Sequence, residues 1–112
     1  MPEIEEHVYE LTPVQLSEKL SAQPGIRLID IREPFEWELC RIEGAELLPM
    51  NSIPDRLGEL GQDETIILYC HHGTRSAHAL NFLYAQGYRD IAHLAGGINA
   101  WAQDIDSTMR TY

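Results

Sequence analysis

The 112-residue chain has little of several features that mark particular protein classes. It has only two cysteines, Cys40 and Cys70, which are too few for a disulfide framework and form no C-x-x-C pair of the thioredoxin or zinc-knuckle type. No apolar run approaches the ~20 residues that a membrane-spanning helix needs. The acidic start has no signal-peptide pattern. We therefore expect a protein of a reducing compartment, the cytoplasm, with no membrane partner.

Basic residues are also scarce: the chain has 8 Lys and Arg against 18 Asp and Glu, which gives a formal net charge of −10. Nucleic acids and anionic membranes attract clustered Lys and Arg, so we expect neither as the main partner. The length is typical of one domain. We expect a single domain over residues 1–112, monomeric by default, with a core from about 7 to 103 and frayed polar ends at 1–6 and about 104–112.

Short β-rich runs alternate with helical patterns, which predicts an α/β fold with a mainly parallel sheet. The most hydrophobic run, 65–69, is apolar at consecutive positions, so it predicts a strand in the middle of the sheet that is buried on both faces. An N-cap at Thr12, Pro13 at the first helical position and Gln15 in a capping box predict a helix to about Ala22. The other predicted strands are 7–10, 26–31, 46–49 and 90–94, and the other predicted helices are 33–39, 51–60, 75–86 and 97–101.

The central strand leads into Cys70 and then into a loop, 71–76, that ends where a helix begins. In open α/β sheets, ligands bind at the carboxyl ends of the strands. A loop that closes onto a helix N-terminus presents unpaired main-chain N–H groups, and these donors stabilise a thiolate over a thiol. Gly73 allows the positive φ that such a tight loop requires. The pattern therefore predicts that Cys70 is an ionised nucleophile or carries an anionic group.

The charge pattern around this loop is unusual for so acidic a chain. The 25 residues between Glu64 and Asp90 contain no Asp or Glu, but they contain two arginines and three histidines. A buried strand excludes acids in any case, but that does not account for the exposed face of the following helix. We favour a cationic mouth that binds anions, formed by Arg75, His71 and His72. For the two histidines, plain solvent-exposed loop residues remain an equal alternative.

Four segments together resemble the single-domain rhodanese family, which transfers sulfur through a cysteine persulfide. The resemblance covers about residues 7–103 and implies a three-layer fold with a mainly parallel five-stranded sheet and helices on both faces. The four segments are Asp-x-Arg within 28–33, the turn 42–45, the active-site loop 70–76 and the Gly-Gly…Trp segment 94–101.

The length of the cysteine loop bears on the reaction that the resemblance implies. Related phosphatases and arsenate reductases use a Cys-x5-Arg loop that is wide enough for a tetrahedral oxyanion, whereas this chain has four residues between Cys70 and Arg75. The smaller bowl suits one extra sulfur atom on Cys70. Sulfur transfer is therefore favoured over phosphate chemistry.

The resemblance implies a sulfurtransferase that needs no cofactor. The Cys70 thiolate attacks the outer sulfur of a donor such as thiosulfate, sulfite leaves, and an acceptor takes the terminal sulfur from the Cys70 persulfide. The acceptor would be cyanide in the assay and a thiol or a sulfur-carrier protein in the cell. Arg75 would orient the donor sulfonate, with His71 and His72 as further donors.

The main-chain N–H groups of the loop are expected to hold the negative charge of the persulfide, as an oxyanion hole holds its anion. These amides belong to residues 71–76, which include Gly73, Thr74 and Ser76. The Ser76 side chain is expected to cap the helix. Asp30 and Arg32 are expected either to brace the loop or to form a purely structural ion pair.

Two rival interpretations remain. The first is a non-catalytic protein-binding module of the same fold. The second is a metal site at Cys70, His71 and His72, which we do not favour because adjacent histidines on a tight loop point in different directions and no fourth ligand has suitable spacing. The chain also departs from the family turn, where Cys40, Arg41 and Glu43 replace Gly, His and Pro. Cys40 is either a resolving thiol or, as we favour, a bystander.

Overall fold

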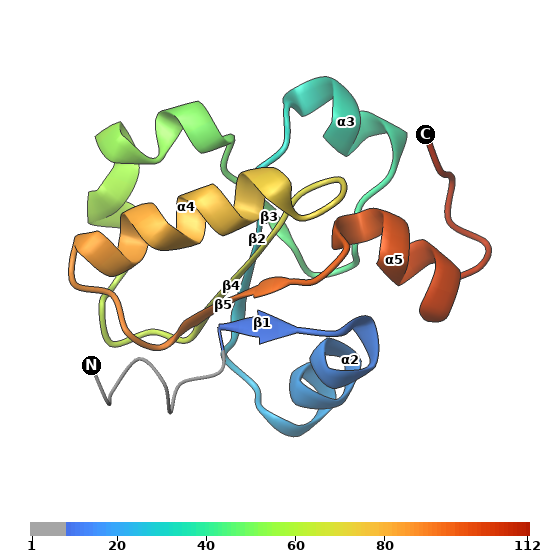
Figure 1. Cartoon of the computed structure of the whole chain (residues 1–112), viewed down its shortest axis with the longest axis horizontal. Helices are drawn as coiled ribbons and strands as arrows, with labels where there is room; N and C mark the ends of the chain where they lie inside the picture. The colour runs from blue at the N-terminus through green and yellow to red at the C-terminus, as the bar shows by residue number, and fades with distance from the viewer. Residues whose placement is uncertain (1–8) are drawn as a thin grey trace.

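The computed structural model describes residues 9–112 and contains one five-stranded sheet in which all paired neighbours run parallel, in the order β1-β5-β4-β2-β3 (Figure 1). The predicted fold class is thus confirmed. The strands are β1 (Glu10–Leu11), β2 (Arg27–Asp30), β3 (Glu46–Leu47), β4 (Ile66–Tyr69) and β5 (Ile91–Leu94). The helices are α2 (Pro13–Ala22), α3 (Pro34–Leu39), α4 (Thr74–Ala85) and α5 (Gly97–Asp104), with the 3-10 segments η1 (Met50–Ser52) and η2 (Pro54–Glu59).

Strand β4 lies in the middle of the sheet, between β5 and β2, as its continuous apolar run predicts. Its side chains alternate between two cores because successive residues of a strand point to opposite faces. Ile66 and Leu68 belong to one hydrophobic cluster, and Ile67 and Tyr69 belong to the other. Both faces of the strand are therefore buried.

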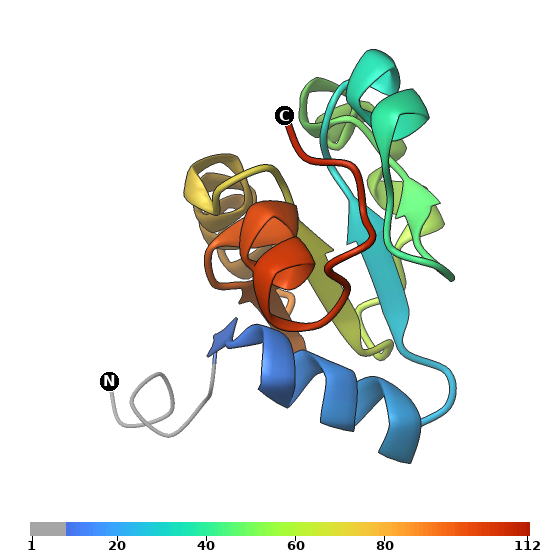
Figure 2. The same cartoon turned by 90° about the vertical axis from the view of Figure 1, so that its right-hand side faces the viewer.

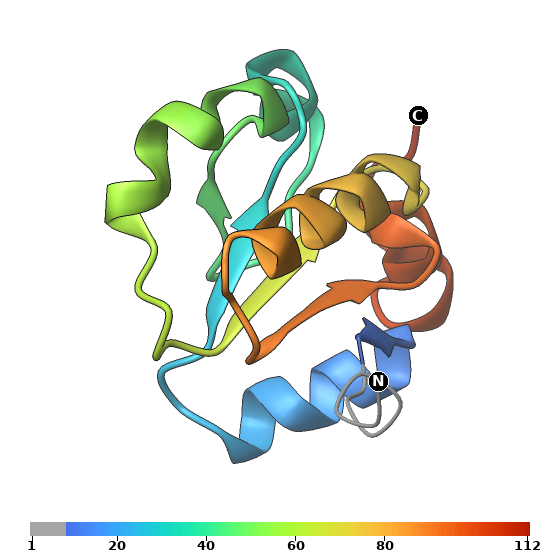
Figure 3. The same cartoon turned by 60° about the vertical axis from the view of Figure 1, so that its left-hand side comes forward.

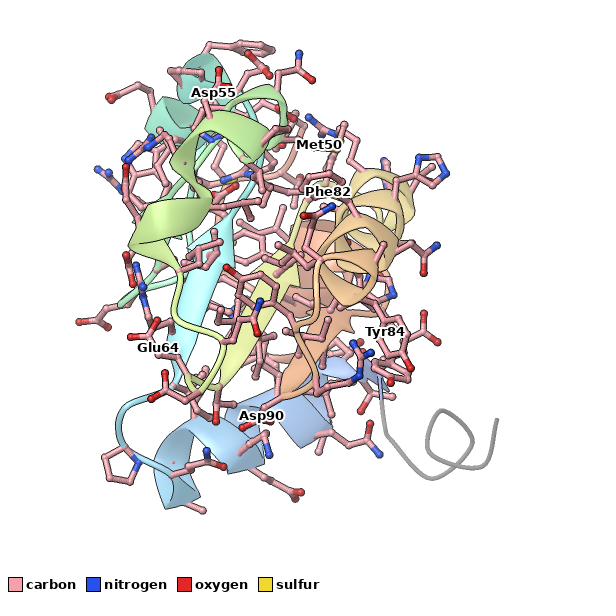
Figure 4. All side chains as sticks on the ribbon, turned by 90° about the vertical axis from the view of Figure 1, so that its left-hand side faces the viewer. Met50, Asp55, Glu64, Phe82, Tyr84 and Asp90 are labelled. Carbon is pink, nitrogen blue, oxygen red and sulfur yellow. The ribbon has the colours of Figure 1, made fainter. Side chains whose placement is uncertain are left out.

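Helices cover both faces of the sheet (Figures 2 and 3). On one face, α4 and the two 3-10 segments contribute to the first cluster, and Met50 and Phe82 line a cavity between them (Figure 4). On the other face, α2 contributes Leu16, and α5 contributes Ile98 and Trp101. The three-layer arrangement leaves the carboxyl ends of the strands free for loops, and β4 passes there directly into the Cys70 loop.

Two local expectations are wrong, and a third lies partly outside the described residues. The predicted helix at 51–60 is two 3-10 segments, because Pro54 has no N–H to donate and Arg56 has non-helical dihedral angles. The predicted strand at 7–10 falls partly on residues 7 and 8, which lie outside the description, and β1 begins at Glu10. Residues 104–112 were expected to be frayed, but Tyr112 returns to contact the Cys70 loop.

Within residues 9–112, no helix combines the length and the apolar character that crossing a membrane requires.

Candidate active site

Cys70 follows β4 directly, and its side chain lies beneath the loop that joins β4 to α4. The residue is 1% exposed. Its Sγ accepts hydrogen bonds from the main-chain N–H of Gly73 at 3.1 Å and of Ser76 at 3.3 Å. Gly73 has φ +109°, a conformation that a residue with a side chain rarely adopts. The loop therefore aims main-chain donors at the sulfur, as the sequence predicts for this position.

The N-terminus of α5 forms hydrogen bonds with the first two residues of the loop, Cys70 and His71. The N–H of Ile98 donates to the carbonyl of Cys70 at 2.8 Å, and that of Asn99 donates to the carbonyl of His71 at 3.1 Å. Gly97, with φ +62°, permits this approach, because a Cβ at that position would overlap both carbonyls. The Gly-Gly…Trp segment thus supports the loop that begins at Cys70.

Arg75 forms a bidentate ion pair with Glu36 of α3. Its two terminal nitrogens lie 2.8 and 2.9 Å from the carboxylate oxygens. Glu36 is only 4% exposed, and hydrogen bonds from Arg75 lower its pKa to about 2 against the opposing effect of burial. The hydrogen bonds to Glu36 are the largest cause that raises the pKa of Arg75, against the opposing effect of burial. In this structure the guanidinium is thus committed to Glu36 rather than free to bind a donor.

Tyr112 connects this ion pair to a second one. Its hydroxyl donates to Glu36 Oε2 at 2.7 Å and accepts from Arg32 at 2.7 Å. Arg32 is fully buried and pairs with Asp30 at 2.6 Å. Burial, the largest cause, raises the pKa of the Tyr112 phenol to about 12. Asp30 and Arg32 therefore form a buried ion pair, and the Tyr112 hydroxyl connects Arg32 to Glu36.

The loop histidines lie together at the same edge. The rings of His71 and His72 are 3.9 Å apart, and the ring of Tyr112 stacks on His71 at 3.8 Å with an interplanar angle of 7°. Burial, followed by the neighbouring His72, lowers the pKa of His71. His72 and Thr74 are exposed. The structure thus gathers the predicted loop residues, with His71 covered and His72 open to solvent.

The expected capping role of Ser76 is wrong. The N-cap of α4 is Gly73, and Ser76 is the third residue of the helix, fully buried. Its hydroxyl lies 3.5 Å from Cys70 Sγ, 3.2 Å from the Gly73 carbonyl and 2.9 Å from Nδ1 of His93. Helix α4 places this side chain beneath the sulfur because the third residue turns back toward the loop.

Cys40 lies near the buried arginine, with its Sγ 3.9 Å from Arg32 and its carbonyl accepting a hydrogen bond from Arg32 at 2.6 Å. Cys40 and Cys70 are both free thiols and form no disulfide with each other. In the described part of the chain, no three His, Cys, Asp or Glu side chains are grouped so that they could hold a metal ion.

The sequence reasoning missed three contributors to the site: Glu36, Tyr112 and His93. Glu36 and Tyr112 lie 39 and 76 positions from their partners, so no local spacing indicates the contact. His93 falls on a strand position that is normally apolar, and a buried polar residue in a central strand is a signal that a partner must be present.

Comparison with known proteins gives one consistent result. The model of the rhodanese-like domain matches residues 12–104. A protein named sulfurtransferase from Allochromatium vinosum is 40% identical over 96 residues, which are 86% of this chain and 90% of that protein. The thiosulfate sulfurtransferase GlpE of Pseudomonas fluorescens is 33% identical over 80% of this chain and 81% of its own length.

Other relatives are longer. The probable adenylyltransferase/sulfurtransferase MoeZ of Mycobacterium tuberculosis is 41% identical over 91% of this chain, and the match spans 26% of that protein. Among solved structures, a rhodanese-like domain protein from Staphylococcus aureus has a TM-score of 0.80 at 30% identity and covers 94% of this chain and 99% of its own.

Proposed function

The chain belongs to the rhodanese-like domain family, and from that membership we propose that it is a sulfurtransferase in which Cys70 carries sulfane sulfur as a persulfide. Relatives named as sulfurtransferases support the transfer of sulfur in general. The donor, the acceptor and the persulfide on Cys70 are our proposal.

In the first step, the Cys70 thiolate attacks the outer sulfur of thiosulfate. A new S–S bond forms, the bond between the two sulfurs of thiosulfate breaks, and sulfite leaves with its electron pair. In the second step, a thiol acceptor attacks the outer sulfur of the persulfide and regenerates the Cys70 thiolate. A small thiol or a cysteine of a sulfur-carrier protein would serve as acceptor and would leave as its own persulfide.

The observation that carries the proposal is the pair of main-chain N–H groups, from Gly73 and Ser76, that converge on Cys70 Sγ at the end of β4. Such fixed donors stabilise negative charge on sulfur without the cost of ordering water. The loop amides that do not contact Sγ are available to the outer sulfur of the persulfide. The Arg75–Glu36 pair fixes the start of α4 and keeps a guanidinium at the rim.

The main test is Cys70→Ser. We expect it to abolish thiosulfate:cyanide transfer while circular dichroism shows a folded protein, because a hydroxyl cannot form the persulfide. Cys40→Ser is the matched control and should retain the activity. Turnover by Cys70→Ser, or loss of turnover in the control alone, would contradict the assignment of the nucleophile.

Mass spectrometry gives a second, independent readout. Incubation with thiosulfate should add the mass of one sulfur atom to the wild-type chain, and cyanide or a reductant should remove it. Cys70→Ser should gain nothing. A wild-type chain that stays unmodified under saturating thiosulfate, with other sulfur donors also inactive, would favour the binding-module interpretation instead.

A further inference from the structure

The buried thiol of Cys70 has a hydrogen-bonded connection to the surface that runs behind the loop. Cys70 Sγ lies 3.5 Å from Ser76 Oγ, which lies 2.9 Å from Nδ1 of His93. Nε2 of His93 lies 3.3 Å from Oε2 of Glu10, whose side chain is 65% exposed. The proposed function uses neither His93 nor Glu10.

The hydrogen positions in this chain are mutually consistent in one direction. The Glu10 carboxylate can only accept, so it takes the Nε2–H of a neutral His93, which leaves Nδ1 as the acceptor. The Ser76 hydroxyl has two acceptors in reach, the Gly73 carbonyl at 3.2 Å and Nδ1 at 2.9 Å. With its hydrogen on the shorter contact, to Nδ1, its oxygen accepts from the S–H of Cys70. Each donor thus meets one acceptor from the thiol to the carboxylate.

We infer that Ser76, His93 and Glu10 form a relay that takes up the proton of the Cys70 thiol and so favours the thiolate, an inference that rests on the proposed nucleophilic role of Cys70. The S–H proton moves to Ser76 Oγ as the hydroxyl proton of Ser76 moves to His93 Nδ1. Cys70 becomes a thiolate and His93 an imidazolium, and no group is oxidised or reduced. The Glu10 carboxylate stabilises the imidazolium, and its exposure lets the proton pass to solvent.

The surroundings of His93 support this direction of transfer. Burial, the largest cause, lowers the pKa of His93, so the ring is neutral at rest, and the Glu10 carboxylate acts against burial by stabilising the imidazolium that the transfer forms. Among residues 9–112, the polar side chains bonded to the ring are Glu10 from β1 and Ser76 from α4, and the β4 residue in register with it is the apolar Leu68. Beyond the sulfur, on the other side, lies the Arg75–Glu36 pair.

The burial of Cys70 explains why such a relay matters. With the residue 1% exposed, little of the sulfur faces bulk water, and the relay gives its proton a hydrogen-bonded path to the surface. Acting through Ser76, His93 is a positioning and proton-accepting residue, since it does not itself touch the reacting sulfur.

The test uses Cys40→Ser as the parent, so that Cys70 is the only thiol in the chain. The readouts are the ultraviolet absorbance of the thiolate against pH and the rate of alkylation by iodoacetamide against pH. His93→Asn keeps a hydrogen-bonding group near the position of Nδ1 but cannot take a proton. We expect it to move the midpoint of thiolate formation up by about one pH unit, which is about tenfold less thiolate below the midpoint.

Two further variants complete the design. Glu10→Gln, on an exposed side chain, should move the midpoint in the same direction by a smaller amount. His78→Asn, on the exposed side of α4, is the matched control and should leave the midpoint unchanged. If His93→Asn does not fold, Glu10→Gln decides the question.

An unchanged midpoint in folded His93→Asn would overturn the relay and leave His93 with a packing role only. The proposed function is judged separately, because ionisation and alkylation of Cys70 require no sulfur donor. A parent that shows the expected titration but takes no sulfur from thiosulfate would retain the relay and refute the sulfur transfer.

Discussion

The two flanks of the Cys70 loop are built from different chemistry. On the charged flank, Arg75 forms an ion pair with Glu36, whose carboxylate also accepts a hydrogen bond from the Tyr112 hydroxyl. On the histidine flank, the Ser76 hydroxyl contacts the sulfur, and the His93 imidazole contacts that hydroxyl. Both flanks are packed against the same loop, and each contains a buried polar side chain, Glu36 on one and Ser76 with His93 on the other.

The difference lies in how each flank responds to pH. The ion pair lowers the pKa of Glu36 to about 2 and raises that of Arg75, so these charges persist throughout the neutral range. Burial lowers the pKa of His93, which keeps that ring neutral but leaves it able to take a proton. The Arg75–Glu36 pair thus provides charges that do not change with pH and fixes the loop. His93 provides the proton acceptor in the proposed relay.

The largest expected effect on stability is on the charged flank and appears in acid. The ordinary pKa of Glu36 is 4.5 and the folded value is about 2, so the stabilisation is present above 4.5 and is lost as the pH falls through about 2. Between about pH 5 and 2, the wild type should lose about 3 kcal/mol more unfolding free energy than Glu36→Gln. Urea denaturation at a series of pH values measures this.

Glu59→Gln is the control for that experiment. Glu59 is exposed and pairs with Arg56 on the surface, so its substitution should leave the acid dependence close to that of the wild type. Equal acid dependence in wild type and Glu36→Gln would show that the charged flank does not stabilise the fold.

The histidine flank loses its contribution to stability at a higher pH than the charged flank. Stability that depends on neutral His93 is lost as the pH falls below 6.5, the ordinary pKa of histidine.

A smaller effect is expected from removing the other half of the ion pair. Arg75→Ala leaves the buried Glu36 carboxylate without its cation, and because Arg75 is itself 34% exposed the cost is about 2 kcal/mol. Arg56→Ala breaks a surface pair and is the matched control, with little change expected. If both variants unfold at the same urea concentration, the burial of Glu36 has no energetic consequence.

The smallest expected effect is that of Tyr112→Phe. It keeps the ring stacked on His71 but removes the hydroxyl that joins Arg32 to Glu36, which costs about 1 kcal/mol of unfolding free energy. Thermal denaturation with calorimetry would detect it. Tyr112→Ala should cost more, since it also removes the stacking, and equal losses in the two variants would show that the hydroxyl carries the whole contribution.

Local sequence signals predict the parts of the fold that depend on local physics. The apolar run in β4, the capping residues of α2 and the left-handed Gly73 each act within a few residues, and each prediction is confirmed. The predicted helix after Asn51 is wrong because Pro54 interrupts the hydrogen-bond ladder, which is a local signal that the prediction gave too little weight.

Contacts between site residues that are close in sequence could be predicted, but contacts between residues that are far apart in sequence could not. Cys70, Gly73 and Arg75 lie in one loop, so their proximity follows from spacing. The ion-pair partner of Arg75 comes from α3, and the partner of Ser76 comes from β5. These pairings depend on strand order and helix packing, which local sequence patterns do not reveal. The predicted role of Arg75 therefore lacks its ion pair with Glu36.

The hydrogen bonds from α5 to the loop have a practical consequence for the transfer of the Cys70 loop to another protein. Residues 70–76 do not hold their shape alone, because the amides of Ile98 and Asn99 restrain the two carbonyls that begin the loop, and only a glycine at 97 admits the contact. A graft into another scaffold must therefore carry both segments in their mutual orientation. Conversely, a designer could retune the reactivity of the cysteine by editing a turn more than twenty residues downstream in the sequence, without altering the loop itself.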